Sequence, residues 1–240
     1  MSIILSGKPL ILSLKKFLSL IIPCVWLCVS NVYGAPCYGT RLPEGKKFIG
    51  GFQSYTIFKR ELKNNYGKLK SLQHFFQLSY GVYNWLSIDL KGGAGNIKQY
   101  PNLGDEADYS NSFAGGYGFR IRAYNHENLK IVLGFQHISV HPQSVHLGNV
   151  KNKAILDDWQ GSLLASYKLS VVTPYLGVKW SRVDYIHWIG EERKRKMSDT
   201  TKSVGLICGF DFPLNAKAWV NLEGQFFDSE ALAVSVNFEF

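Results

Sequence analysis

Two residues, Asp184 and His187, stand three positions apart where a polar link begins. A carboxylate that orients a histidine can help it activate a water molecule for hydrolysis. Other polar links carry further acids, at Asp105, Glu106, Asp108, Asp157 and Asp158. These residue types allow a hydrolytic site. They are equally typical of solvated links, which contain acids without any catalytic role.

Three histidines, His137, His141 and His146, lie near one predicted link and are candidate metal ligands. Their spacing is irregular and no cysteine accompanies them, which disfavours a metal site. The chain contains no Gly-rich phosphate loop, no GxSxG elbow, no HExxH helix and no CxxC pair. The sequence therefore predicts no cofactor and no catalysis.

Strict alternation of apolar and polar residues dominates the chain from Phe48 onward. In one segment Leu86, Ile88 and Leu90 alternate with polar neighbours. This period of two predicts strands. Ten such segments are recognisable, within residues 51–60, 74–81, 85–93, 112–124, 130–138, 159–169, 175–181, 203–212, 218–226 and 231–240. The faces of the first two are not assigned, because their alternation is less regular.

The links between these segments alternate in length. Links after even-numbered segments are tight, at 81–84, 124–128, 170–174 and 212–217. Links after odd-numbered segments are mostly longer, at 62–70, 96–111, 141–158 and 187–201, although the last, near 228–230, is short. Short turns at one end and long loops at the other are typical of transmembrane barrels. We therefore predict an all-β, antiparallel up-and-down transmembrane β-barrel of about ten strands.

The polar positions of the strands, which alternate with the apolar ones, include both acidic and basic residues. In a membrane barrel these positions face the lumen, so we predict the following lumen-facing charges: Asp89, Lys91, Arg120, Arg122, Lys168, Lys179, Asp211, Glu223 and Glu239. Tryptophans fall mostly near predicted strand ends, as interfacial belts require: Trp85, Trp159, Trp180, Trp188 and Trp219. A soluble sandwich, with the same charges in water, is the competing interpretation.

The first residues have the features of a secretory signal peptide. Lys8, Lys15 and Lys16 precede a short apolar run, and small residues precede Ala35. We predict a signal peptide at 1–34, a short periplasmic lead-in at 35–47 and the barrel at 48–240. Removal of the signal takes away three lysines and no acid, which lowers the formal net charge from +9 to +6. Export makes nucleic acid an unsuitable partner for this basic chain.

Two motifs carry a family resemblance: the turn SYGVYNWLSIDL (Ser79–Leu90) and the closing strand that ends in Phe240. They resemble the periplasmic hairpins and the C-terminal aromatic signature of small bacterial outer-membrane β-barrel proteins. The resemblance implies location in the outer membrane, among its lipids and lipopolysaccharide. It also implies that the barrel assembly machinery reads Phe238 and Phe240. Proteases of the omptin type are similar in strand number, but their motif residues cannot be matched here.

The run EERKRK (Glu191–Lys196) is the densest group of charges. It is either a solvated loop tip or a site for an anionic surface ligand, such as lipopolysaccharide phosphate or an acidic host polymer, bound by Arg193, Lys194, Arg195 and Lys196. Ten strands enclose an interior that side chains nearly fill. We therefore expect a structural, adhesive or surface-interaction protein. The alternatives are a narrow channel for small, anionic solutes and, less favoured, a hydrolase at the rim.

Overall fold

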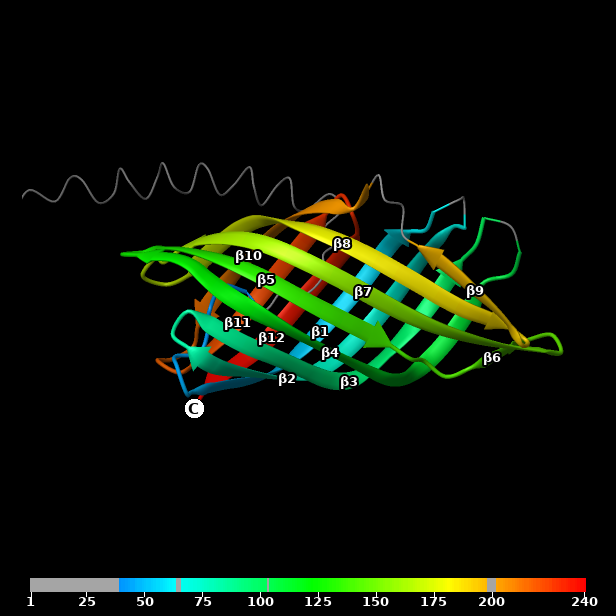
Figure 1. The fold of residues 1–240 in the computed structure, drawn as a ribbon, viewed down its shortest axis with the longest axis horizontal. Coiled ribbons are helices and arrows are strands. Elements are labelled where there is room, and N and C mark those ends of the chain that lie inside the picture. Colours follow the sequence, from blue (N-terminus) through cyan, green and yellow to red (C-terminus); the bar gives the residue numbers. More distant parts are fainter. Residues whose placement is uncertain (1–38, 64–65, 103, 198–201) are drawn as a thin grey trace, which may run out of the picture. The chain divides into compact units, whose positions relative to one another are not determined.

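In the computed structural model, residues 39–63, 66–102, 104–197 and 202–240 are described, and the predicted signal peptide lies outside them. Most of these residues belong to one antiparallel sheet of twelve strands (Figure 1). The strands are β1 (Phe48–Glu61), β2 (Lys68–Tyr83), β3 (Leu86–Tyr100), β4 (Ala107–His126), β5 (Leu129–Val140), β6 (Val145–Leu147), β7 (Val150–Tyr167), β8 (Thr173–Ile189), β9 (Glu192–Met197), β10 (Val204–Pro213), β11 (Ala218–Phe226) and β12 (Glu230–Glu239). Among the described residues, no helix is long and apolar enough to cross a membrane.

Ten of the strands close into a barrel. Two pairings complete the circle: β7 with β8, and the first strand β1 with the last strand β12. In the latter, Ile49 pairs with Glu239 and Phe52 with Val236. The short strands β6 and β9 extend hairpins outside the circle, against β7 and β8 respectively. The predicted barrel of about ten strands is therefore confirmed.

The two ends of the barrel differ as the link lengths predict. Tight links at 84–85, 127–128, 168–172 and 214–217 define the turn end, at the left in Figure 1. The opposite end, here the loop end, carries the short link at 227–229, the ends of β1–β4 away from the turns, and the short strands β6 and β9. Both chain segments that close the barrel, around Phe48 and Phe240, meet at the turn end, where their backbones exchange hydrogen bonds.

The strands extend further at the loop end than the sequence suggests. The predicted links at 141–158 and 187–201 are partly strand, because β7 begins at Val150 and β8 continues to Ile189. These polar stretches pair with each other in unbroken register, from Asn152 with Ile189 to Ser166 with Tyr175. Charged residues tolerate strand structure here because the ladder satisfies their backbone groups.

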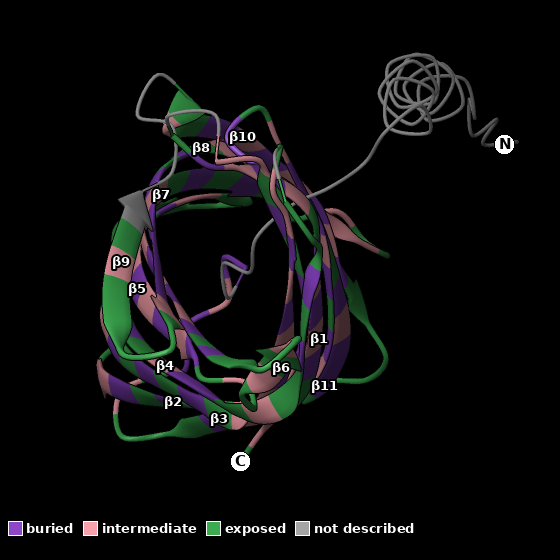
Figure 2. Cartoon of the chain, turned by 90° about the vertical axis from the view of Figure 1, so that its right-hand side faces the viewer, coloured by how far each residue is buried: buried purple, intermediate pink, exposed green. Residues whose placement is uncertain are grey.

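Exposed apolar side chains cover the outside of the barrel, and its buried polar side chains lie mostly inside. On β3, Leu90 is 53% exposed whereas Asp89 is 0% exposed. A similar alternation of exposed and buried residues follows much of the circle in Figure 2, which views the barrel from the loop end. A soluble sandwich would bury its apolar face. An apolar exterior around a polar interior is instead the arrangement of a membrane barrel.

A β-bulge explains why the face of the first strand could not be assigned from sequence. The register of β1 shifts between Ile57 and Arg60 in its pairing with β2, and between Ile57 and Lys59 in its pairing with β12. A bulge inserts an extra residue and changes which side chain points inward. Ile57 faces the interior. In a regular strand Arg60, three positions later, would face outward, but the shift turns it inward, where it is 2% exposed.

Candidate functional site: the barrel interior and its two mouths

Arg120 of β4 forms a two-pronged ion pair inside the turn-end half of the barrel. Its Nε lies 2.9 Å from Asp89 Oδ2 and its Nη2 lies 2.8 Å from Asp89 Oδ1. Nη2 also donates to Ser79 Oγ, and Nη1 donates to the carbonyl of Arg41 at 2.5 Å. A bidentate guanidinium–carboxylate pair fixes both orientation and distance. Arg120 thereby fastens the chain before β1 to the barrel wall.

A second group of buried charges gathers around Asp228, in the short link between β11 and β12. Asp228 Oδ2 lies 2.6 Å from Arg60 Nη1 and 2.8 Å from Lys179 Nζ. Ser181 Oγ donates to the same carboxylate oxygen at 2.9 Å. Removing a charge from water is costly unless it is paired and hydrogen-bonded. The two cations and the carboxylate thus pair with one another, although Arg60 Nε and Asp228 Oδ1 have no hydrogen-bond partner among the described residues.

Neutral groups connect the remaining acids of β10 and β11. The Asn221 amide donates to Asp211 Oδ1 and to the Tyr175 hydroxyl, both at 2.8 Å. Tyr175 in turn donates to Glu223 Oε2 at 2.8 Å, and Gln225 donates to Glu223 Oε1. This chain of hydrogen bonds joins two buried carboxylates across neighbouring strands.

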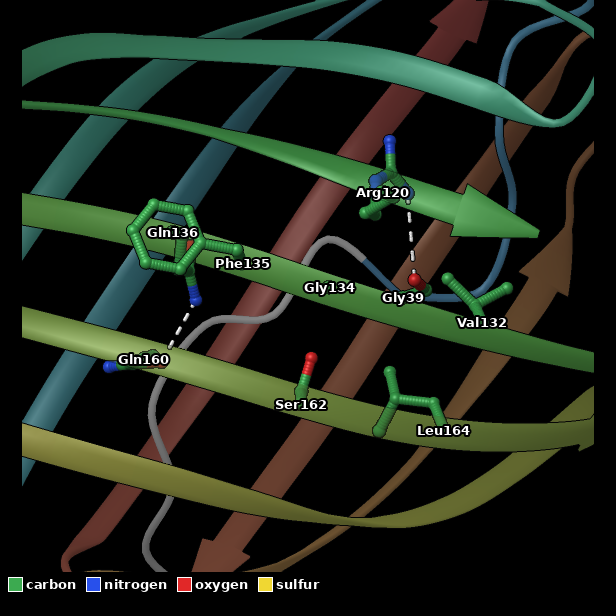
Figure 3. A pocket seen from close by; sticks show the side chains of 9 residues that line it. All are labelled: Gly39, Arg120, Val132, Gly134, Phe135, Gln136, Gln160, Ser162 and Leu164. Atoms are coloured by element: carbon green, nitrogen blue, oxygen red, sulfur yellow. Dashed lines mark hydrogen bonds between the residues drawn. The ribbon is translucent and has the colours of Figure 1, made fainter. Parts of the chain in front are cut away.

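Glutamines span the interior between opposite walls. Lys91 Nζ lies 3.1 Å from Gln53 Oε1 and 3.3 Å from Gln136 Oε1, and Gln136 donates to Gln160 at 2.9 Å. Figure 3 shows Gln136 and Gln160 side by side next to a small cavity that Arg120 and the backbone of Gly39 also line. That cavity holds about 10 Å³, the space of roughly one water molecule. Side chains therefore occupy this level of the barrel.

The loop-end half of the interior contains many buried apolar side chains beside its buried polar ones. Phe75, Ile97, Ile138 and Val183, contributed by four different strands, are all 0–1% exposed. They belong to one buried cluster, in this article the apolar layer: Tyr55, Ile57, Leu62, Leu69, Phe75, Ile97, Ala107, Tyr109, Ala114, Ile138, Val140, Ala154, Leu156, Val183, Tyr185 and Ala231. The sequence analysis did not foresee it, because its members alternate with polar residues on the interior parity. The buried charges of Arg60 and Asp228 lie at the same end of the barrel.

The loop-end mouth contains a cavity of about 550 Å³. Tyr66 and His187 line it, with the Tyr66 hydroxyl 2.8 Å from His187 Nε2. Burial raises the pKa of the Tyr66 phenol. Deeper in, the Tyr185 hydroxyl donates to Gln99 at 2.8 Å. Phenols, an imidazole and amides therefore cover the apolar layer on this side.

The turn-end mouth contains a cavity of about 370 Å³ lined largely by charged groups. Part of the predicted lead-in forms its wall, since Gly39, Thr40 and Leu42 are buried at this end. The Arg41 guanidinium lies 4.6 Å from the centre of the Trp219 ring. Trp219 is 4% exposed and faces this cavity. Its assignment to a lipid-facing aromatic belt is therefore wrong, because it belongs to the inward parity of β11.

The predicted lumen-facing charges separate into two groups. Asp89, Lys91, Arg120, Lys179, Asp211 and Glu223 are buried in the interior. Arg122, Lys168 and Glu239 are half-buried or exposed and line the turn-end mouth. Sequence reasoning missed the partners Arg60 and Asp228. The bulge in β1 breaks the alternation that would have placed Arg60 on the inward face. Asp228 lies in a link between two strands, and nothing in the sequence except the shortness of that link indicates that its side chain is buried.

Asp184 and His187 do not form a catalytic pair. They lie on opposite faces of β8, as a spacing of three residues in a strand requires. Asp184 pairs with Arg182 and Arg195, whereas His187 contacts Tyr66 in the loop-end mouth. The carboxylate therefore orients arginines, not the histidine.

The other acidic candidates are also dispersed. Asp108 pairs with Lys98, and Asp105 lines the loop-end cavity while Glu106 is exposed beside it. Asp157 faces outward near His137, at 3.6 Å, whereas Asp158 faces inward and accepts a hydrogen bond from Gln160.

The three candidate metal-binding histidines lie on β5 and β6 or in the link between them. His137 stacks on Trp159, with ring centres 4.0 Å apart, and His141 lies 2.8 Å from the Ser139 hydroxyl. His146 is exposed on β6. Within the described ranges, no three His, Cys, Asp or Glu side chains are placed to hold a metal ion.

The basic run forms β9, a strand that folds back on the loop-end tip of β8. Trp188 pairs with Arg193 and His187 with Lys194 in the ladder. The Arg193 guanidinium lies 5.6 Å over the Trp188 ring, and Lys194 lies 3.3 Å from Glu192. Arg193 and Arg195 are exposed. The run predicted as a loop thus forms a hairpin with β8, and its arginines are exposed.

The C-terminal aromatics lie at the rim of the turn end. Phe240 stacks on Phe48 with ring centres 6.2 Å apart, and its backbone N–H donates to the Phe48 carbonyl at 3.0 Å. Phe238 and Phe240 both project outward and are exposed. The terminal residue is therefore held in the sheet while its ring remains accessible.

Comparison with known proteins yields a local sequence match. A family model described as Chlamydia major outer membrane protein matches residues 147–189, which include the hairpin of β7 and β8. The major outer membrane porin of Chlamydia trachomatis serovar A is 61% identical over 28 residues, and that of serovar E is 57% identical over the same length. Each match spans 12% of this chain and 7% of the porin.

Solved structures with a similar outline are only distantly related. An outer membrane channel from Pseudomonas putida F1 aligns over 85% of this chain and 99% of its own, with 11% identity and a TM-score of 0.44. The outer membrane protease OmpT of Escherichia coli aligns over 84% and 96%, with 13% identity and a TM-score of 0.40.

The remaining argument rests on the molecule itself and the matched hairpin. A circle of ten antiparallel strands has an apolar outside, a charged and hydrogen-bonded inside, tight turns at one end and long loops at the other. These are the features that outer-membrane barrels share. The chain therefore has the fold of an outer-membrane β-barrel, and its hairpin of β7 and β8 is similar in sequence to the Chlamydia major outer membrane protein.

Proposed function

We propose that this barrel is closed to solutes and acts, without catalysis, by binding molecules at the bacterial surface. The apolar layer is the observation that carries the proposal. Water-filled pores have polar linings, and a hydrophobic constriction excludes water and hydrated ions. Phe75, Ile97 and Ile138 occupy the position where a conducting barrel would need polar groups.

The orientation of the barrel supports a role at the surface. In outer-membrane barrels the short turns face the periplasm and the long loops face outward. The β8–β9 hairpin then projects from the cell with Arg193 and Arg195 exposed. Clustered cations attract anionic polymers. The phosphate groups of lipopolysaccharide are the partner of this kind nearest to the hairpin, and acidic host polymers share the same chemistry.

The separation of Asp184 from His187 supports the absence of catalysis. A hydrolase at the rim would need a carboxylate beside the histidine to activate water. Here Asp184 is bound to arginines on the other face of β8.

Other partners follow from the exterior of the barrel. The exposed apolar parity, including Leu90, Leu133 and Val178, would contact outer-membrane lipid. The accessible aromatic rings at the turn end, Phe238 and Phe240, suit recognition by the barrel assembly machinery.

A narrow channel is the second candidate. Cavities of about 550 Å³ and 370 Å³ open at the two mouths. A solute that enters either cavity would have to cross only the middle of the barrel. The matched relatives are named porins, although this chain spans only 7% of their length in the match. A movement of the apolar layer would be required to join the two cavities.

Conductance across planar lipid bilayers tests the proposal. The refolded protein should give a flat current trace at voltages of either sign. The double variant Phe75→Ala, Ile138→Ala, which thins the apolar layer, should conduct more than the parent. Stepwise currents from the unmodified protein would overturn the closed barrel and favour the channel.

A further inference from the structure

We propose that the turn-end mouth is a binding site for a phosphate group, presented from the periplasm by inorganic phosphate or by a small phosphate monoester. Four cations line its cavity of about 370 Å³, namely Arg41, Arg122, Lys130 and Lys168. The hypothesis is independent of the surface-binding function, because the mouth lies at the opposite end of the barrel from β9.

The four cations come from four segments that the fold brings together. Arg41 lies in the lead-in, Arg122 on β4, Lys130 on β5 and Lys168 just after β7. Neighbouring registers place them on the interior side of adjacent strands, with Lys130 opposite Ser166 and the Lys168 backbone bonded to Asn128. Burial and repulsion from the other three cations both disfavour the charge of the Lys130 ammonium, whereas Asp211 attracts it. A cluster of this kind is unfavourable unless an anion occupies it.

These cations lack protein counter-ions at close range. Among the described residues, none of the four has a carboxylate oxygen within 4.0 Å, in contrast to Arg60 and Arg120 deeper in the barrel. The Nε–H of Arg122 is buried and has no hydrogen-bond partner in the described part of the chain. A buried donor without an acceptor carries a desolvation cost that a bound anion would remove.

The acids that face the cavity are engaged elsewhere. Glu44 lies 2.6 Å and Glu239 lies 3.8 Å from Lys47 Nζ, at the outer edge of the mouth. Asp211, which does not line the cavity, accepts a hydrogen bond from Asn221 and also attracts Arg41 and Lys130 electrostatically. Asp89 is bound by Arg120. The cavity therefore keeps an excess of positive charge.

The number and type of groups favour phosphate over a carboxylate. Four cations and two acids line the cavity, which leaves a formal charge of +2, and a phosphate monoester carries about −1.5 to −2 at neutral pH. The guanidinium groups of Arg41 and Arg122 match phosphate oxygens in pairs. Ser166 and Thr173 supply hydroxyls around the rim. The volume lies within the range of small-ligand sites, about 300–1,000 Å³.

Titration calorimetry of the full folded barrel in detergent tests the proposal, with inorganic phosphate, glycerol phosphate, sulfate and acetate as separate ligands. Phosphate, glycerol phosphate and sulfate should bind, and acetate should bind about tenfold more weakly because it carries half the charge. Acetate affinity equal to that of phosphate would overturn the assignment, as would the absence of binding heat up to about 10 mM phosphate.

Matched variants locate the binding. The double variant Arg122→Gln, Lys130→Gln should weaken phosphate binding by about tenfold or more, because hydrogen bonds to charged groups are the stronger ones. The control Lys151→Gln, Lys153→Gln removes the same charge from exposed positions at the loop end of β7 and should leave the affinity unchanged. Equal weakening in both would identify a diffuse charge effect and contradict a defined site. Heat-modifiable gel migration verifies that each variant is folded.

Discussion

Arg60 and Asp228 meet inside the barrel, 2.6 Å apart, although 168 positions separate them in the sequence. One lies beyond a bulge at the loop end of the first strand, and the other lies in the last tight link. Lys179 completes the group from a third strand. The contact ties β1 to the β11–β12 link next to the seam that closes the barrel.

Replacement of Asp228 by alanine should destabilise the barrel strongly. It leaves Arg60 and Lys179 buried without their shared carboxylate, and breaking a buried ion pair from one side costs about 3–5 kcal/mol. The midpoint of urea unfolding in detergent, followed by gel migration, measures the loss.

The control for that variant is an exposed ion pair between β1 and β12, on the outer face of the barrel. Lys59 lies 3.5 Å from Glu230, and both are about a third exposed. Lys59→Gln should cost no more than about 1 kcal/mol, because solvent screens such pairs. Similar losses in the two variants would contradict the distinction between interior and exterior charges.

Two adjacent phenylalanines of β2 test the inside-out arrangement. Phe75 is 0% exposed within the apolar layer, whereas Phe76 is 73% exposed on the outer face. Phe75→Ala should cost about 3–5 kcal/mol because it leaves a cavity. Phe76→Ala should cost only about 2 kcal/mol of transfer energy, since lipid or detergent refills the space. A larger loss at Phe76 in equilibrium unfolding would contradict the assignment of faces.

Removal of the terminal ring should affect assembly more than stability. In Phe240→Ala the backbone bonds to Phe48 remain, so refolding in detergent should proceed as in the parent. In cells the variant should accumulate less in the outer membrane, as quantified by the heat-modifiable fraction of the envelope. Normal accumulation would mean that the assembly machinery does not depend on this ring.

The exposed arginines of β9 should control binding to lipopolysaccharide. The variant Arg193→Gln, Arg195→Gln should bind vesicles that contain it about tenfold more weakly, since a cation near an anionic surface contributes about 1 kcal/mol. The control Lys46→Gln, Lys217→Gln removes two exposed charges at the turn end. Co-sedimentation at several salt concentrations compares them. Binding unaffected by the first pair would exclude the hairpin as the contact.

Peptide hydrolysis provides an independent check on catalysis. Because Asp184 and His187 lie on opposite faces of β8, the folded protein should cleave none of a panel of fluorogenic peptides. Cleavage that disappears in His187→Ala would overturn this expectation and would require another acidic partner for the histidine.

Much of the architecture could be predicted from alternation and link length. The alternation of apolar and polar residues predicts which way each side chain points. Leu90 and Asp89 could therefore be assigned to opposite faces from the sequence alone. The order of short and long links predicts which end of the barrel has the turns and which end has the loops. Both signals are local in sequence, and an up-and-down barrel is built from local hairpins.

The features that escaped prediction depend on irregularity or on distance. The bulge in β1 breaks the parity that would have placed Arg60 inside. Trp219 resembled a belt residue because it lies near a strand end, yet its parity points inward to Arg41. The cationic mouth depends on Arg41, whose segment has no periodic pattern. Only the closed barrel brings that segment beside β4, β5 and β7.

The pairing of β1 with β12 also has a consequence for how the chain must fold. Until the final ten residues arrive, the first strand presents a row of unpaired N–H and C=O groups, a template for joining other chains. Closing a circle through contacts so far apart in sequence is slow. Because Ile49 pairs with Glu239 only when the barrel closes, the partly assembled barrel is the aggregation-prone species. The yield of folded barrel therefore depends on protection of the open β1 edge while the chain travels to the outer membrane.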